Sequence, residues 1–168
     1  AVTGTRESFR CAEVGWANTS NTPFRFHKMW MHEGGISTPL IARWPAQIKQ
    51  TGGWTRQTGH VIDLLATFAD ISHAKYPETR NGKQITPLSG VSLLPTFQQP
   101  EQTKPRTLHW EHEGNQAIRL GNWKLVKEHR QDWELYDLSQ DRSELHDLAK
   151  SEPERAASLT EAWQTWAE

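Results

Sequence analysis

Four short segments with alternating apolar and polar residues follow Pro105, and they constrain the fold more than any other feature of this 168-residue chain. The segments are Thr107 to Glu113, Ala117 to Leu120, Trp123 to Val126 and Glu134 to Leu138. A period of two residues is typical of strands, and Gly121-Asn122 is a two-residue hairpin signal. The pattern predicts a four-stranded antiparallel sheet, one face of which must be covered.

The last part of the chain predicts the helix that covers this sheet. Residues 151–154, Ser-Glu-Pro-Glu, have the spacing of a capping box with a proline in the first turn. The apolar residues that follow lie on one helical stripe: Leu159, Ala162, Trp163 and Trp166. We therefore expect truncation before Trp163 to destabilise the sheet.

The first part of the chain has a different pattern. Thr38 to Trp44 is apolar and β-favouring and ends at Pro45, which predicts a buried strand over residues 38–44. Residues 59–72 carry apolar side chains at helical spacing, with Thr58 as a possible cap. Residues 73–106 are rich in proline, glycine and polar residues and predict a long connection. The fold class expected from both parts is α+β.

Charge and composition exclude several kinds of partner. The net charge of −1 argues against nucleic acid, because nucleic-acid domains usually carry a basic excess. No apolar run approaches the ~20 residues of a membrane span, and residues 1–10 have no signal-peptide core. The single cysteine, Cys11, excludes an internal disulfide framework.

Chemically active residues gather before a paired glycine. Lys28, His32 and Glu33 precede Gly34-Gly35, which lets the backbone adopt positive φ and bend sharply. A lysine at the mouth of a strand is a compact cation suited to an oxyanion such as sulfate or phosphate. The alternative is a solvated surface lysine ahead of an ordinary turn.

The order of these residues resembles a known family. Asn-Thr-Pro-Phe-Arg at 21–25 is followed by Lys28, five positions before Glu-Gly-Gly, and by Ile-Ser-Thr-Pro-Leu-Ile-Ala-Arg-Trp-Pro at 36–45. Further motifs follow in the same order at 63–67, 90–95, 110–115, 119–125 and 134–138. From Cys11 onward the chain resembles the C-terminal portion of an arylsulfatase of the formylglycine-dependent sulfatase family.

The resemblance implies a fold and an activity. Residues 1–98 would be the end of an alkaline-phosphatase-like α/β catalytic domain, and residues 99–168 a C-terminal antiparallel sheet subdomain with a terminal helix. The chain would belong to a sulfuric ester hydrolase in which Lys28 binds a sulfate oxygen. His32, His112 and Glu113 are candidates for lining the substrate pocket. Formylglycine and calcium or magnesium would be supplied by the rest of the intact enzyme.

The chain departs from the family pattern at two places. Cys11 is followed by Ala12-Glu13-Val14-Gly15 and so lacks the Cys/Ser-x-Pro/Ala-x-Arg motif of the nucleophile. No aspartate precedes Asp63, and Glu7 alone does not replace the family's metal ligands. We therefore predict no metal site in this chain, and no sulfatase activity of the chain alone.

Other interpretations stay open at this point. His109 and His112 suggest zinc, but alternation sends them to opposite faces of a strand. A non-catalytic module could bind sulfated glycan or a partner protein through His27, Lys28, Trp30 and His32, and an exposed sheet surface would favour self-association.

Phosphate or phosphonate esters are not distinguished from sulfate by Lys28. Family resemblance predicts an exported or periplasmic protein, with its signal upstream of Ala1.

Overall fold

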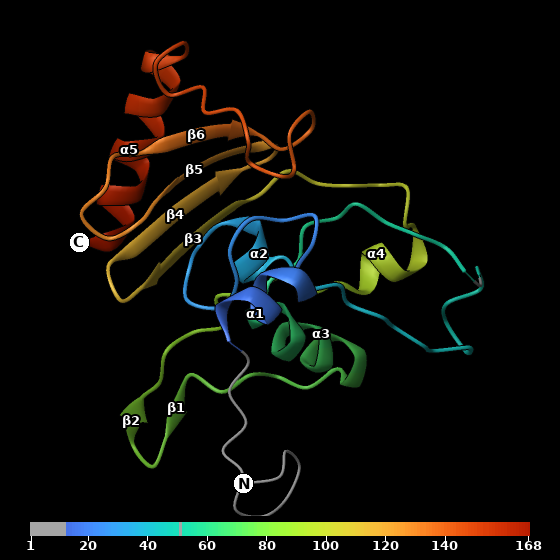
Figure 1. Ribbon diagram of the computed structural model, residues 1–168. Helices are drawn as coiled ribbons and strands as arrows, with labels where there is room; N and C mark the ends of the chain where they lie inside the picture. Colours follow the sequence, from blue (N-terminus) through green and yellow to red (C-terminus); the bar gives the residue numbers. More distant parts are fainter. Residues whose placement is uncertain (1–12, 51) are drawn as a thin grey trace, which may run out of the picture. The chain divides into compact units, whose positions relative to one another are not determined.

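The computed structural model describes residues 13–50 and 52–168 (Figure 1). The chain forms two compact units. The sheet unit contains residues 13–39 and 107–168, and the connecting unit contains residues 40–106. This division differs from the predicted boundary after residue 98, because the segment that carries Lys28 packs on the sheet.

The sheet has the predicted four antiparallel strands in the order β3-β4-β5-β6. Their bounds are Thr107–His112 (β3), Asn115–Leu120 (β4), Trp123–Lys127 (β5) and Glu134–Asp137 (β6). Trp110 lies opposite Ala117, which lies opposite Val126. Two-residue turns join the first three strands, and the predicted hairpin at Gly121-Asn122 is confirmed. The α+β class is therefore confirmed.

Helix α5, Pro153–Ala167, covers one face of the sheet, as predicted (Figure 1). The buried residues at this face are Ile118, Leu125, Leu135, Leu159 and Trp163. Trp163 also donates a hydrogen bond from Nε1 to the carbonyl oxygen of Trp110, at 3.3 Å. The ring of Trp166 stacks on His109 with 4.8 Å between the ring centroids.

The predicted capping box at the start of α5 is wrong. The residue before the helix is Glu152, and its side chain makes no capping hydrogen bond. The hydroxyl of Ser151 donates instead to the carbonyl oxygen of Leu148, at 3.1 Å. Pro153 occupies the first helical position, where its fixed φ suits the helix and its missing N–H costs nothing, so the helix begins one residue later than the box requires.

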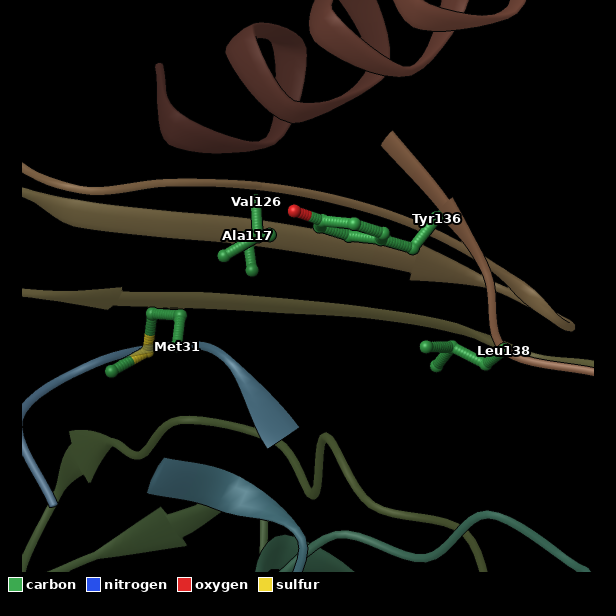
Figure 2. Packing of buried hydrophobic residues seen from close by; sticks show 5 residues of the cluster. All are labelled: Met31, Ala117, Val126, Tyr136 and Leu138. Atoms are coloured by element: carbon green, nitrogen blue, oxygen red, sulfur yellow. The ribbon is translucent and has the colours of Figure 1, made fainter. Parts of the chain in front are cut away.

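The opposite face of the sheet is covered as well (Figure 2). Met31, from the segment before α2 (Glu33–Ile36), packs on Ala117, Val126, Tyr136 and Leu138. Neighbouring positions on the central strands, such as Leu125 and Val126, are both buried and face opposite sides. The sequence pattern predicts at least one covered face of the sheet, and the structure has two covered faces. A short helix, α1 (Val14–Ser20), precedes this segment.

The connecting unit holds two helices and a short ribbon. Helix α3 spans Ile62–Ser72, which confirms a helix within the predicted range 59–72, and α4 spans Leu94–Gln98. Strands β1 (Thr79–Arg80) and β2 (Lys83–Gln84) pair in an antiparallel ribbon. None of the helices described in either unit is long and apolar enough to cross a membrane.

The buried side of α3 differs from the predicted apolar stripe. Asp63, Ala66 and Thr67 are buried, whereas Leu65 and Phe68 are exposed. Asp63 accepts hydrogen bonds from the backbone N–H groups of His60 and Val91 and from Arg106. Burial alone would raise the pKa of Asp63, but the Arg106 guanidinium and the two N–H donors lower it. Asp63 therefore organises the connecting unit, and Thr58 does not cap the helix.

No strand forms over residues 38–44, so this prediction is wrong for the structure described. The segment has no regular secondary structure, and Ile41 is 90% exposed. A strand needs a neighbour to satisfy its backbone N–H and C=O groups. Within residues 13–50 and 52–168, the strand pairs are those of the ribbon and the four-stranded sheet, and none includes this segment.

We predict that Trp163→Ala destabilises the chain by about 3–5 kcal/mol, because it opens a cavity between α5 and the sheet and removes the bond to Trp110. Chemical denaturation of the full chain measures this change. Trp54→Ala is the matched control, since Trp54 is 88% exposed, and it should change the free energy of unfolding by less than about 0.5 kcal/mol. Equal effects of the two substitutions would show that α5 does not support the sheet.

Candidate functional site

Lys28 lies in an exposed loop with an unusual backbone. Phe26 has φ 62° and Met29 has φ 111°, both in the region that residues with a side chain rarely adopt. The side chain of Lys28 is exposed. The loop therefore presents a solvated ammonium from a backbone that its surroundings must hold in place.

Trp30, two residues after Lys28, anchors the loop to the sheet unit. Its indole Nε1 donates to Glu128 Oε2, at 2.9 Å, just after β5. The ring stacks on Phe26 with 5.1 Å between centroids, and the ring of His27 meets it edge-on at 4.6 Å. These contacts make Trp30 a packing residue rather than an open platform for a sugar ring.

Asn115, the first residue of β4, connects the loop to the end of the sheet. Its Nδ2 donates to the carbonyl oxygens of Met29 and His112, both at 3.2 Å. Its Oδ1 accepts from the backbone N–H of His129, at 3.1 Å. One side chain thus joins the Lys28 loop, the β3–β4 turn and the loop between β5 and β6.

The predicted pocket residues His112 and Glu113 lie at this same end of the sheet. Both are exposed, and Glu113 and Gly114 form a turn with φ 52° and 81°. Positive φ at both central residues is what a type I′ hairpin turn requires. The side-chain amide of Asn115 bonds the carbonyl oxygens of both Met29 and His112, so His112 and Glu113 lie near the loop that carries Lys28. Their contact with substrate stays a prediction.

His32, the third predicted pocket residue, has a different environment. Its side chain is buried, and its Nε2 lies 2.9 Å from Glu134 Oε2. Its ring packs at 4.7 Å from that of Phe26. The chain turns inward at Met31 to fill the sheet face, and this carries His32 away from the surface. The structure gives His32 the role of an internal anchor.

Glu134 is the centre of a polar group under the loop. It accepts a hydrogen bond from the hydroxyl of Tyr136 at 2.7 Å, and Tyr136 in turn accepts one from Arg25 at 3.0 Å. The hydrogen bond from His32, which outweighs the effect of burial, lowers the pKa of Glu134 to about 2, with further help from Tyr136 and Arg25. Burial and the Glu134 carboxylate raise the pKa of Tyr136.

A second group fixes Glu33, the residue after His32. Lys124 is fully buried in β5, and its Nζ lies 3.0 Å from Glu33 Oε1 and 2.8 Å from Glu144 Oε1. The backbone N–H of Glu33 also donates to Glu144 Oε2, at 2.7 Å. A buried cation therefore lies between two buried carboxylates, one from α2 and one from the segment after β6.

Two arginines add positive charge near Glu33. Burial would raise the pKa of Glu33, but the Lys124 ammonium outweighs it, and Arg119 and Arg142 lower the pKa further. Arg142 Nη2 lies 3.6 Å from Glu33 Oε2. Glu33 is thus ionised at neutral pH, and its ion pairs hold α2 against the sheet.

Gly34 and Gly35 are required for close packing. A Cβ atom at Gly34 would lie 2.0 Å from the carbonyl oxygen of Arg25, and one at Gly35 would lie 1.9 Å from that of Trp30. Neither glycine has positive φ, which corrects the expectation from sequence. The pair allows α2 to pass directly beneath the loop that carries Lys28.

The described residues do not fit a metal ion. No group of three or more His, Cys, Asp or Glu side chains within residues 13–50 and 52–168 is arranged to hold one. His109 stacks on Trp166 on the α5 side of β3. His112 is three residues further along the same strand, so its side chain faces the opposite side of the sheet. Cys11 and Glu7 lie outside the described residues.

Several residues of this site were missed by the sequence analysis. Asn115 was part of a recognised motif, but nothing in its position indicated contacts to three segments. Glu144 lies outside every motif that the sequence analysis used. Lys124 did carry a signal, because a lysine at the centre of the apolar strand Trp-Lys-Leu-Val faces the same side as Val126 and must be buried.

A family model and several relatives match this chain. The model of the family "N-sulphoglucosamine sulphohydrolase, C-terminal" matches residues 24–164. The uncharacterized sulfatase PB10D8.02c of Schizosaccharomyces pombe is 32% identical over 167 residues, which are 95% of this chain and 30% of the relative. N-acetylgalactosamine-6-sulfatase of Mus musculus is 30% identical over 105 residues, 62% of this chain and 19% of the relative.

Solved structures show the same likeness. The crystal structure of Ps i-CgsB has a TM-score of 0.72 and 28% identity, and the match covers 87% of this chain and 32% of that one. BT33336S-sulf of Bacteroides thetaiotaomicron, from work on the metabolism of multiple glycosaminoglycans, has a TM-score of 0.69 and 25% identity, with 84% and 31% covered. The chain spans about a third of the length of these two structures or less.

We predict that Lys124→Met costs about 3–5 kcal/mol, because it removes the buried cation that Glu33 and Glu144 share and leaves Glu33 only the half-exposed Arg142 at 3.6 Å. Urea unfolding of the full chain measures the loss. Adding Glu33→Gln and Glu144→Gln to Lys124→Met should recover part of it, since the carboxylates are then neutral. Lys75→Met, at an exposed position, is the control. A Lys124→Met chain as stable as this control would contradict the assignment.

We also predict that the stability of the chain depends on pH in the acid range because of Glu134. Its pKa in the folded chain is about 2, below the ordinary value of 4.5, so its contribution is present above pH 4.5 and is lost as the pH falls toward 2. Glu134→Gln should therefore cost about 2 kcal/mol at pH 7 and little at pH 2. Thermal unfolding across this range measures it, with Glu101→Gln as an exposed control. A loss that does not depend on pH would disprove the role of the charge.

Proposed function

Because the chain belongs to the family of N-sulphoglucosamine sulphohydrolase C-terminal domains, we propose that it works as part of an arylsulfatase-like sulfuric ester hydrolase. The observation that supports this most directly is that the family match spans both the Lys28 loop and the whole sheet that anchors it. The matches to sulfatases favour this activity over a non-catalytic binding module.

In this proposal Lys28 binds an oxygen of the sulfate group. Its ammonium is exposed on a loop that is held at Met29 and Trp30, so the backbone that carries it need not be ordered before an anion binds. Negative charge on the sulfate oxygens must be stabilised in the transition state, and a cation beside them on a preorganised loop does this with little reorganisation of the backbone. Lys28 would thus lower the barrier as well as bind.

The remaining chemistry lies outside the residues described. By family resemblance, a formylglycine nucleophile and a calcium or magnesium ion supply the attack on sulfur when they are present. The described residues form no cluster that fits such an ion, so the proposed part of this chain is to bind and orient the ester. We propose accordingly that the 168-residue chain alone does not turn over sulfate esters.

The proposed substrate is a sulfated sugar. The matching family is described as an N-sulphoglucosamine sulphohydrolase and the mouse relative is an N-acetylgalactosamine-6-sulfatase, so both names specify sulfated amino sugars. His112 and Glu113 are proposed to contact the sugar beside Lys28, and His32 is not. Phosphate and phosphonate esters stay alternative substrates for a lysine at this position. Export and self-association stay predictions.

We predict that Lys28→Ala lowers kcat/KM for a sulfated sugar by about 10²–10³-fold in an active sulfatase that carries this chain, because one fixed donor to the transition state is lost. Lys28→Arg should lower it less, since the charge is kept. Lys75→Ala, an exposed lysine of the connecting unit, is the matched control and should leave turnover unchanged. Near-normal turnover in Lys28→Ala would refute the proposed role.

A further inference from the structure

The backbone next to Lys28 is strained. Met29 has φ 111°, a value that favours glycine, and its side chain is 45% exposed, so its own packing does not explain the conformation. Strained backbone persists only where the surrounding structure determines it, and it gathers at functional sites. Some contact must therefore hold Met29, and with it the direction in which Lys28 leaves the loop.

Asn115 makes that contact. It is 8% exposed, and its amide bonds the carbonyl oxygen of Met29 directly. The same amide bonds the carbonyl oxygen of His112 and the N–H of His129. A side chain that donates two hydrogen bonds and accepts one is needed here, which leaves asparagine and glutamine, and the shorter one fits a strand end that the three segments crowd.

The other anchors act further from Lys28. The ion pairs of Lys124 and the hydrogen bond of His32 fix residues 32 and 33, at the base of the loop. Trp30 is fixed through its side chain, and its backbone N–H donates to the carbonyl oxygen of His27, at 3.2 Å, which closes a local turn around Lys28 but does not reach the sheet. Among these anchors, Asn115 is the one that ties the backbone of a residue adjacent to Lys28 to a strand of the sheet.

The segments that Asn115 joins leave little room for adjustment. A Cβ atom on Gly114 would lie 2.1 Å from Nδ1 of His129, so the imidazole ring rests directly against the turn. Gly114 also has φ 81° and donates its N–H to Glu111 at 2.9 Å. The turn, the His129 loop and the Lys28 loop thus form one close-packed end of the sheet.

We infer that Asn115 is the positioning residue for Lys28 and fixes it relative to His112 and His129, so that a sulfated sugar has its sulfate at Lys28 and its ring beside the β3–β4 turn. This inference rests on the proposed function of Lys28. It adds a residue that touches neither the sulfate nor the reacting atoms and acts on Lys28 through the backbone of Met29.

Asn115→Asp tests the inference with almost no change of shape. The carboxylate still accepts from His129, but it cannot donate to Met29 and faces two carbonyl oxygens instead. In an active sulfatase that carries this chain, we expect kcat/KM for a sulfated sugar to fall about 10–100-fold, since displacing a catalytic group by about 1 Å can cost 10²-fold. Asn122→Asp, the same change at the exposed turn between β4 and β5, should have no effect.

Two further measurements separate positioning from general stability. Amide hydrogen exchange in the 168-residue chain should become at least tenfold faster at residues 27–31 in Asn115→Asp and stay unchanged in Asn122→Asp. In the Lys28→Ala background, Asn115→Asp should cause no further loss of turnover, because its effect passes through Lys28. A merely structural role would make the two losses multiply, and that result would overturn the inference.

The possible failures are distinguishable. Normal turnover in Lys28→Ala alone would refute the proposed function, whereas a large loss there with multiplying effects would refute only the inference. If Asn115→Asp does not fold, the pair Met29→Gly and Asn115→Ala replaces it. Glycine adopts φ 111° without strain, so the fold no longer needs the amide, but Lys28 is still not held. Turnover equal to that of Met29→Gly alone would then overturn the inference.

Discussion

The buried ammonium of Lys124 is the interaction on which the sheet unit depends. A lysine with no solvent exposure is tolerated only with counter-charges, and Glu33 and Glu144 supply them from two segments far apart in the sequence. Each partner ties its own segment to β5. Because one ammonium pairs with both carboxylates, the three segments are stabilised together rather than one by one.

This arrangement explains how an exposed lysine can be held in a defined place. Apolar packing of Met31 on Ala117 and Val126 brings the segment onto the sheet, and the polar contacts of His32 and Glu33 fix its register there. Hydrophobic contact is not directional, whereas ion pairs and hydrogen bonds are. The loop before Met31 is then short, and the hydrogen bonds of Asn115 and Trp30 determine its conformation.

The two faces of the sheet have different tasks. The α5 face is an apolar core with tryptophans that give stability, and the opposite face carries most of the buried charged and polar groups. Buried polar groups cost free energy unless they are paired, so their concentration on one face indicates that this face is organised for something besides stability. Lys28, His112 and Glu113 lie at one end of the strands, beside this face.

Much of the fold could be predicted from the sequence by itself. Strand alternation, the Gly121-Asn122 turn and the stripe of Trp163 determine the four-stranded sheet and its helix, because these signals are local and depend on residue spacing. The order of motifs likewise pointed to Lys28. Only the tertiary structure decided that residues 13–39 belong to the sheet, that His32 is internal and that Asn115 joins three segments. Those facts depend on contacts between residues far apart in the sequence, such as Glu33 and Glu144 at 111 positions, and no local pattern encodes which distant charge a buried group will meet.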